Sequence, residues 1–250
     1  MHKAFLVTLA LAVFGFGCGV EKAKSGSGGT TGSGGATGSG GAMGSGGATG
    51  ACTKLWTQLT IGTAATSTAT VAGGALVLRS SNAQTNNIHI LLQKPITGDF
   101  DASFDFEAFV SGGTGTFVQA AVAEAVTAPT TPIVTAAIGS VPTVAGDVAG
   151  VSATFQPGAT SVQASTATAG TFRFQRTGAS VTATATPQIG TAATVARADY
   201  GTFGLQIGLQ IGSNQATPAT AETSVRVTAF SIQGGGGAVV ADSFDCNSLK

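Results

Sequence analysis

The chain has 250 residues, of which only 9% are charged, and its 11 basic and 11 acidic side chains cancel at neutral pH. Soluble domains typically carry about 25% charged residues, so we expect a surface made mostly of Thr, Ser, Gln, Asn and Ala. The chain lacks clustered Lys and Arg. This excludes a nucleic-acid partner held through its phosphate backbone, because that mode of binding depends on clustered cations.

The first residues have the pattern of an export signal, which we predict to span residues 1–17. Lys3 supplies a positive charge, and Ala4–Gly17 is a run of fourteen apolar and small residues. The run is too short for a membrane span, which takes about 20 residues, but has the length of a signal-peptide core. The sequence therefore predicts an exported protein.

Cys18 directly follows this run. A Cys at this place resembles the lipobox of bacterial lipoproteins, in which the thiol is acylated and the chain is cleaved just before it. The resemblance implies a lipid anchor on Cys18, the membrane as a partner, and a place in a bacterial cell envelope, at the outer membrane or cell surface. Gly15 departs from the Leu usual at its position, and ordinary cleavage beside an incidental Cys is the alternative.

A glycine-rich linker follows over residues 18–50. Between Gly26 and Thr49 it consists of the hexapeptides GSGGTT, GSGGAT, GSGGAM and GSGGAT. Such a segment buries too little to offset its chain entropy, so we expect a disordered tether spanning roughly 30 Å. The remaining residues, 51–250, are enough for one domain with a buried core.

Alternating sequence patterns predict that this domain is all-β. In Phe100–Val110, the residues Phe100, Ala102, Phe104, Phe106, Ala108 and Val110 alternate with polar ones, which predicts one buried and one wet strand face. A hairpin is predicted where Thr171–Arg176 and Val181–Thr186 flank a short break containing Gly178. Further strands are predicted at Ala75–Arg79, Ile88–Gln93, Phe203–Ile211 and Ser224–Ile232. Phe117–Ala128 fits a strand better than a helix, and many short strands between such breaks favour a sandwich.

The order of these segments resembles the concanavalin A-like lectin/glucanase superfamily, in its laminin-G-like or bacterial surface-protein branches. The resemblance covers most of Trp56–Gln233. It rests on the opening Trp56, GGALVLRSS at Gly73–Ser81, TGDFDASFDFEAFV at Thr97–Val110, FRFQRTGASVTATAT at Phe172–Thr186 and TSVRVTAFSIQ at Thr223–Gln233. It implies a two-sheet jelly-roll sandwich with a concave face that meets carbohydrate in many relatives.

The C-terminal segment Asp242–Leu249 is similar to the strand that opens many such domains, displaced here to the end of the chain. We expect it to fill the first-strand slot, since sandwich termini lie close together; a vestige of a second domain is the alternative. This placement brings Cys246 near Cys52, an even pair in an exported domain, and predicts a disulfide. Free thiols or an intermolecular bridge remain the alternatives.

Three carboxylates, Asp101, Asp105 and Glu107, are predicted to share one strand face. A solvated strand face is the plain interpretation, and a weak Ca²⁺ site is an alternative because hard oxygen ligands gather there. Residues two apart on a strand face lie about 7 Å apart, which suits the two carboxylates of a glycosidase. The Glu-x-Asp-x-(x)-Glu signature of the glucanase branch is nevertheless missing, so no catalytic residue is assigned.

Candidate ligand-binding residues are few, because sugar-binding modules usually stack sugars on exposed Trp or Tyr. Trp56 is expected in the core, and Tyr200, in a polar stretch, is the better candidate for an exposed platform. Arg173, Gln175 and Arg176 are weaker candidates for the lining of a polar face, and a solvated strand is the simpler account.

These features predict a non-enzymatic surface lipoprotein whose sandwich binds a glycan or another surface ligand. A structural or adhesive envelope protein is the alternative, followed by a glycan-cleaving enzyme.

Overall fold

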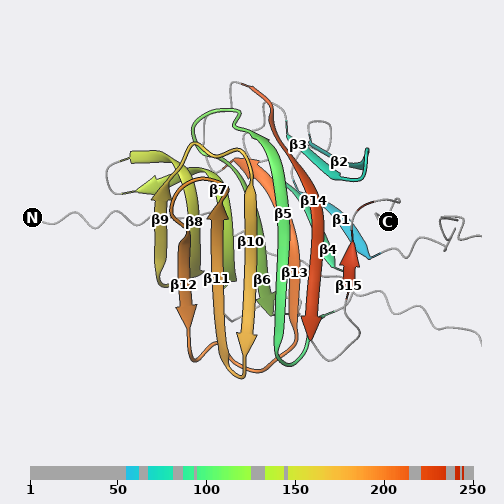
Figure 1. Cartoon of the computed structure of the whole chain (residues 1–250), viewed down its shortest axis with the longest axis vertical. Helices are drawn as coiled ribbons and strands as arrows, with labels where there is room; N and C mark the ends of the chain where they lie inside the picture. Colours follow the sequence, from blue (N-terminus) through green and yellow to red (C-terminus); the bar gives the residue numbers. More distant parts are fainter. Residues whose placement is uncertain are drawn as a thin grey trace, which may run out of the picture.

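The computed structural model describes residues 55–61, 67–80, 87–92, 95–124, 133–143, 146–213, 221–234, 240–242 and 244. Their backbone forms two antiparallel sheets that lie one over the other (Figure 1). In these ranges no helix has the length and apolar character needed to cross a membrane. The predicted leader, lipidation site and tether lie outside the described residues.

The first sheet, called sheet A here, has seven described strands in the spatial order β1-β4-β13-β6-β7-β8-β9. Their bounds are β1 Trp56–Ile61, β4 Asn87–Leu92, β13 Leu205–Ser213, β6 Thr116–Glu124, β7 Ile133–Thr143, β8 Gly146–Gln156 and β9 Thr160–Ala164.

The second sheet, sheet B, has the order β12-β11-β10-β5-β14-β3-β2, and its eighth described strand, β15, also pairs with β14. Their bounds are β12 Ala193–Arg197, β11 Ser180–Pro187, β10 Gly170–Thr177, β5 Phe100–Val110, β14 Thr223–Gly234, β3 Leu76–Ser80, β2 Ser67–Val71 and β15 Val240–Asp242.

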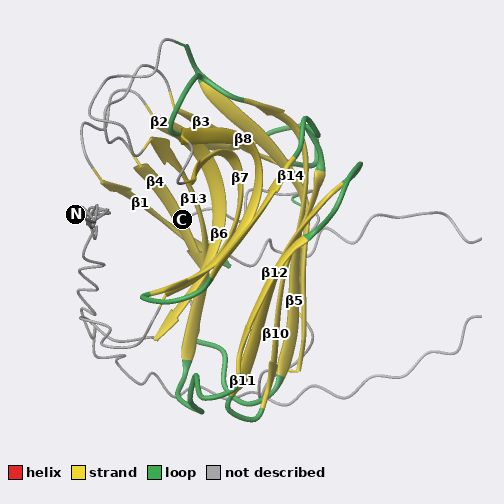
Figure 2. Cartoon of the chain, turned by 90° about the vertical axis from the view of Figure 1, so that its left-hand side faces the viewer, coloured by secondary structure: helices red, strands yellow, loops and turns green. Residues whose placement is uncertain are grey.

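The core lies between the two layers, which Figure 2 shows side by side. Every second residue of each central strand points into it, as period-two alternation requires. Phe104 of sheet B and Val118 of sheet A are both fully buried. Trp56 joins the layers, with its ring centroid 4.8 Å from that of Phe230 in an edge-on contact. The alternating apolar residues therefore build one continuous core.

The predicted strands are confirmed, with bounds that differ by a few residues. The long strand Phe100–Val110 is β5, and the predicted hairpin is β10 and β11, joined by a turn in which Gly178 has a φ of 59°. Phe117–Ala128, which the sequence pattern assigns to a strand in preference to a helix, forms strand β6 as far as Glu124.

One predicted face is wrong at the end of β5. Ala108 has a φ of 50°, and the pairing between β5 and β14 shifts in register at this point. This β-bulge reverses the alternation, so Phe109 is buried while Val110 is 53% exposed. Ala108 and Val110 therefore leave the core face on which the sequence placed them.

The C-terminal segment reaches the sandwich next to β3. Strand β15 pairs with Phe230–Ile232 of β14, whereas β3 pairs with the earlier half of the same strand. Phe244 follows and is buried in the core. Pairing at Asp242 and burial at Phe244 agree with the expected first-strand slot, but the rest of the proposed segment lies outside the described residues and that assignment stays a prediction.

Candidate functional site

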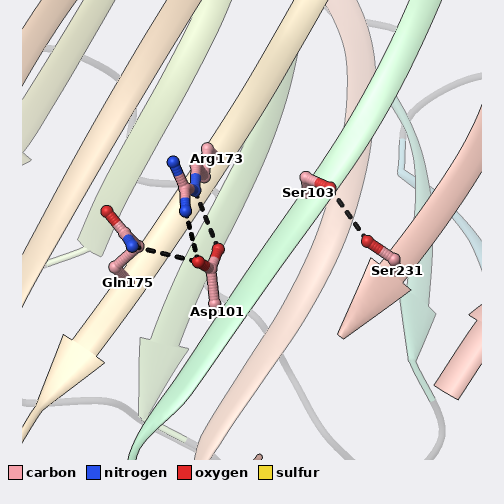
Figure 3. Close-up of polar contacts among 5 residues, drawn as sticks. All are labelled: Asp101, Ser103, Arg173, Gln175 and Ser231. Carbon is pink, nitrogen blue, oxygen red and sulfur yellow. Dashed lines mark hydrogen bonds and ion pairs between the residues drawn. The ribbon is translucent and has the colours of Figure 1, made fainter. Parts of the chain in front are cut away.

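Five of the predicted site residues lie on the outward face of sheet B, on β5 and β10. Figure 3 shows three of them, Asp101, Arg173 and Gln175. Asp101 accepts hydrogen bonds from Arg173 Nε at 2.9 Å, from Arg173 Nη2, and from Gln175 Nε2 at 3.0 Å. The hydrogen bond from Arg173 is the main reason why the pKa of Asp101 lies below its usual value, and burial opposes it. The three side chains are therefore bonded to one another.

The other two carboxylates are also engaged. Thr171 Oγ1 donates to Asp105 Oδ1 at 2.8 Å, and Arg226 Nε donates to Glu107 Oε1 at 3.1 Å. Arginines neutralise the two outer members of the predicted calcium trio, Asp101 and Glu107, so the three do not fit a Ca²⁺ ion. Within the described ranges no group of three or more His, Cys, Asp or Glu side chains is placed to hold a metal ion.

Two predicted ligand-binding residues point into the molecule instead. Tyr200 is only 3% exposed, and its hydroxyl donates to the Val122 carbonyl at 3.4 Å. Burial, with the nearby charge of Glu124, raises the pKa of this phenol. Arg176 is 2% exposed and donates to the carbonyls of Gly178 and Phe203. The prediction of an exposed Tyr200 platform is wrong, because the loop after β12 folds back over the end of the core.

An aromatic side chain that the sequence analysis did not single out lies on the outward face of sheet A. Val118 and Ala120 point into the core, so Phe117 of β6 points away from it. Phe117 is half-buried and pairs in register with Gly212 of β13 on one side and Gly139 of β7 on the other. Neither neighbour has a side chain, so the positions in register with Phe117 on both adjacent strands leave its ring uncovered by their own atoms beyond the backbone.

The next outward position holds two amides. Gln119 of β6 pairs in register with Gln210 of β13, and its Nε2 donates to Gln210 Oε1 at 2.6 Å. This bond uses one donor and one acceptor of the pair. The remaining amide hydrogens and carbonyl lone pairs face the same side as Phe117. Residues two apart on a strand face lie about 7 Å apart, which is close to the length of one sugar ring.

The outward-facing side chains around this pair are uncharged, and most of them are small. Its positions on the four central strands are Gln206, Gly208, Gln210, Gly212, Phe117, Gln119, Ala121, Ala123, Thr135, Ala137, Gly139, Gly150, Ser152 and Thr154. Three of its polar side chains are largely buried, with Gln210 9% exposed, Thr135 5% and Ser152 7%. We call Phe117, Gln119 and Gln210, with the glycines beside them, the Phe117 face.

Comparison with known proteins bears on the fold. No protein-family model matches the chain, and no curated protein matches it in sequence. Among solved structures, a functionally unknown protein from Saccharomyces cerevisiae is similar with a TM-score of 0.51 and 11% identity, over 73% of this chain and 98% of that one. A legume lectin-like domain from Entamoeba histolytica has a TM-score of 0.50 and 9% identity, over 73% and 91% of the two chains.

The domain has a concanavalin A-like fold. A lectin from Bauhinia forficata, solved in complex with GalNAc, is also similar, with a TM-score of 0.48 and 12% identity over 72% of this chain and 99% of that one. At such identities the likeness concerns the fold alone. The likeness to the Entamoeba histolytica domain, together with the two antiparallel sheets, confirms the predicted two-sheet concanavalin A-like sandwich, whose sheet A carries the Phe117 face.

A signal for the Phe117 face is present in the sequence. Residues Leu205–Gly212 read LQIGLQIG, so Gln and Gly alternate at every outward position of β13. This pattern indicates a strand face kept free of bulky side chains. Phe117 itself is not recognisable as a platform in the sequence, because sugar platforms are usually Trp or Tyr and because its glycine neighbours belong to other strands.

Proposed function

We propose that this protein is an exported, lipid-anchored surface protein whose concanavalin A-like domain binds an uncharged glycan without cleaving it. The single observation that carries the glycan proposal is the half-buried ring of Phe117 between Gly212 and Gly139, with the Gln119–Gln210 pair one outward position further along.

The chemistry of a sugar suits this arrangement. One face of a pyranose ring presents C–H groups that pack on an aromatic ring, and its edge presents hydroxyls that both donate and accept hydrogen bonds. Binding sites typically combine such an apolar surface with a few fixed polar groups. Phe117 supplies the first. Gln119 and Gln210 supply the second, and the hydrogen bond between them holds both amides in place before a ligand arrives.

Non-enzymatic binding is favoured by the placement of the acidic residues. The Phe117 face contains no carboxylate, whereas glycosidases require a pair of carboxyl groups flanking the scissile bond. Asp105 and Glu107 lie on the outward face of sheet B, side by side on one strand and not across a cleft. They are far from the aromatic platform, on the other layer of the sandwich.

The leader and tether support the cellular part of the proposal. Acylation of Cys18 would fix the chain to a membrane, and the glycine-rich linker would let the domain turn toward ligands on either side. A freely turning domain engages a surface polysaccharide without requiring a fixed orientation.

A glycan array probed with the chain from Gly19 onward tests this proposal. We expect saturable binding to one or more neutral oligosaccharides, weakened at least tenfold by Phe117→Ala and severalfold by Gln119→Ala. Val110→Ala removes an exposed apolar side chain of sheet B and serves as the matched control, with unchanged binding. Silence across neutral glycans, or equal binding by Phe117→Ala and the control, would contradict the proposal and favour a structural envelope role.

A further inference from the structure

Two hydroxyl side chains on the outward face of sheet A are buried without a hydrogen-bond partner. Thr135 of β7 is 5% exposed and Ser152 of β8 is 7% exposed. Their neighbours along the strands, Ala136 and Ala153, are fully buried in the core, so both hydroxyl-bearing side chains point to the same side as Phe117. Within the part of the chain that the structure describes, neither hydroxyl makes a hydrogen bond.

Such hydroxyls are unfavourable in the free protein. Burying a hydroxyl without a partner destabilises a fold, and the great majority of buried polar groups in proteins are paired. A valine in place of Thr135 or an alanine in place of Ser152 would fill nearly the same space without this cost. Two unpaired hydroxyls on adjacent strands therefore point to a partner that comes from outside the chain.

The two hydroxyls border one small side chain, that of Ala137. Ser152 pairs in register with Ala137 across β7 and β8, and Gln119 pairs with it from β6. Thr135 lies two residues away on β7 itself, about 7 Å along the strand. Three polar side chains thus surround Ala137, and its fourth neighbour on this face, Gly139, has no side chain.

The side formed by Gly139 leads to the aromatic platform. Gly139 pairs in register with Phe117 and has a φ of 141°. A Cβ added to it would lie 2.3 Å from the Thr116 carbonyl oxygen, so the backbone keeps this position free of a side chain. Diagonal neighbours on adjacent strands lie about 7–8 Å apart. Ala137 is therefore about one sugar unit away from Phe117.

We propose that Thr135, Ala137, Gly139 and Ser152 form a second sugar-binding position, here called the Ala137 subsite. The inference rests on the proposed function of the Phe117 face and deepens it. A second sugar ring would lie over the methyl group of Ala137, with its hydroxyls bonded to Thr135 and Ser152. Each of these side chains can both donate and accept, as sugar hydroxyls do.

The subsite also defines the class of ligand. Two neighbouring rings that lie on one sheet face need a linkage that keeps the chain extended and flat. A β-1,4 linkage does so, whereas an α-1,4 linkage winds the chain into a helix and lifts the next ring away. Ala137 and its four neighbours are uncharged. The ligand is accordingly a neutral β-1,4-linked chain and not a single terminal sugar.

Titration calorimetry of the chain from Gly19 onward tests this inference. The probes are glucose, cellobiose and cellotetraose, and a second series of mannose, β-1,4-mannobiose and β-1,4-mannotetraose. In at least one series we expect the disaccharide to bind at least tenfold more tightly than the monosaccharide. The second ring adds both hydroxyl contacts and apolar contact, and the protein side of these contacts is already in place.

Two variants remove one hydroxyl each from the subsite. Ser152→Ala and Thr135→Val should each weaken binding of the tetrasaccharide severalfold and leave binding of the monosaccharide unchanged. Ser103→Ala removes a hydroxyl from the outward face of sheet B, where it pairs with Ser231. It serves as the matched control and should change the affinity less than twofold.

Stability distinguishes a ligand contact from a structural role. Neither hydroxyl has a partner in the free protein, so Ser152→Ala and Thr135→Val should leave the midpoint of urea unfolding unchanged or raise it. A hydroxyl that serves the fold would lower the midpoint when it is removed. Destabilised variants would therefore contradict the assignment of these hydroxyls to a ligand.

The outcomes also separate the Ala137 subsite from the Phe117 platform. Equal affinity for monosaccharide and tetrasaccharide, or hydroxyl variants that bind like Ser103→Ala, would overturn the subsite, while a loss of binding in Phe117→Ala would still support the platform. No binding in either series would overturn the β-1,4 chain, and binding of another neutral glycan on the array would leave the platform standing. Unchanged binding by Phe117→Ala would overturn the platform itself.

Discussion

The ring of Phe244 stacks on that of Trp56, with centroids 6.4 Å apart and an angle of 30° between the ring planes. The two residues lie near opposite ends of the domain sequence. Phe104 and Phe230 complete this aromatic group, with their centroids 4.7 Å apart. The contact explains how a segment that follows a run of glycines becomes part of the core, and it makes the end of the chain a structural element.

Truncating Phe244 should therefore destabilise the whole domain. Removing a buried Phe side chain typically costs about 3–5 kcal/mol, and Phe244 is only 1% exposed. We expect Phe244→Ala to lower the free energy of urea unfolding by about 3 kcal/mol, followed by the fluorescence of Trp56, the single Trp of the chain. Ile189→Ala, at an exposed position, is the control and should change it little. A loss below about 1 kcal/mol in Phe244→Ala would contradict a structural role for the C-terminal segment.

The same contact supports the predicted disulfide between Cys52 and Cys246, both outside the described residues. Cys52 lies shortly before Trp56 in the sequence and Cys246 shortly after Phe244, and we predict that the two thiols form a bridge. Mass spectrometry of non-reduced peptides should recover Cys52 joined to Cys246. Reduction should lower stability by roughly 4–5 kcal/mol, because the bond closes a loop of nearly the whole domain. Two alkylated free thiols, or a Cys246–Cys246 dimer, would contradict the intramolecular bridge.

The sandwich could be predicted because each strand is marked by a pattern within its own stretch of sequence. In β5 and β10 apolar and polar residues alternate within a single stretch of chain, and this pattern is sufficient to assign a strand and its buried face. The reversal at Ala108 was not predictable in the same way, because the bulge arises from the pairing of β5 with β14. That partner is more than a hundred residues away in the sequence.

The candidate site was harder to predict from the sequence for the same reason. Phe117 is proposed as a platform because Gly212 and Gly139 lie beside it on other strands, and this pairing cannot be read from one sequence. Tyr200 is the opposite case, because the sequence predicted it to be exposed and the structure buries it. Its polar neighbours Arg197 and Asp199 indicate an exposed loop, yet the ring turns inward to contact Phe155, with centroids 6.0 Å apart.

Acid should weaken the domain in part through Asp101. Its pKa lies below the ordinary value of 3.8, chiefly through the hydrogen bond from Arg173. A carboxyl group with a lowered folded-state pKa contributes stability above its unfolded pKa, and loses that contribution as the pH falls through the folded value. The side chains of Arg173 and Asp101 are 50% and 37% exposed, so the contribution should be about 1 kcal/mol or less.

Urea unfolding at about pH 6 and about pH 2 checks this expectation. Asp101→Asn should be less stable than the unmodified chain at the higher pH, and the difference should shrink at the lower one. Asp147→Asn, which removes a carboxyl group that accepts from Ser140, serves as the control. A difference that stays constant with pH would show that Asp101 acts through packing and not through its charge.

Anchoring should depend on one thiol. If Cys18 is acylated, Cys18→Ser should move the protein from the membrane fraction into the soluble fraction of the cell envelope, since a signal peptide without a lipid leaves no stable attachment. Cys52→Ser is the matched control and should remain in the membrane fraction. Incorporation of a labelled fatty acid into the unmodified chain, but not into Cys18→Ser, gives a direct measurement. Membrane retention of Cys18→Ser would contradict the lipid anchor.

Arg176 should matter for folding although its surface neighbour Arg173 should not. The buried guanidinium of Arg176 donates from Nε to the Gly178 carbonyl at 3.2 Å and from Nη1 to the Phe203 carbonyl at 2.6 Å. It thus joins the β10–β11 turn to the segment before β13. Arg176→Met would remove both hydrogen bonds, and a hydrogen bond from a charged group contributes about 1.5–3 kcal/mol. We expect a loss of about 3 kcal/mol in urea unfolding.

The stability of Arg176→Lys should lie between that of the unmodified chain and that of Arg176→Met. A lysine keeps the charge but cannot reach both carbonyls with a planar fork. Arg173→Met is the control for the loss of a strand arginine from β10. Its pair with Asp101 is exposed, so the variant should lose about 1 kcal/mol or less. Equal losses in Arg176→Met and Arg173→Met would show that the turn and the loop are held by their packing alone. A large gap between them would instead make Arg176 the residue that closes this end of the sandwich.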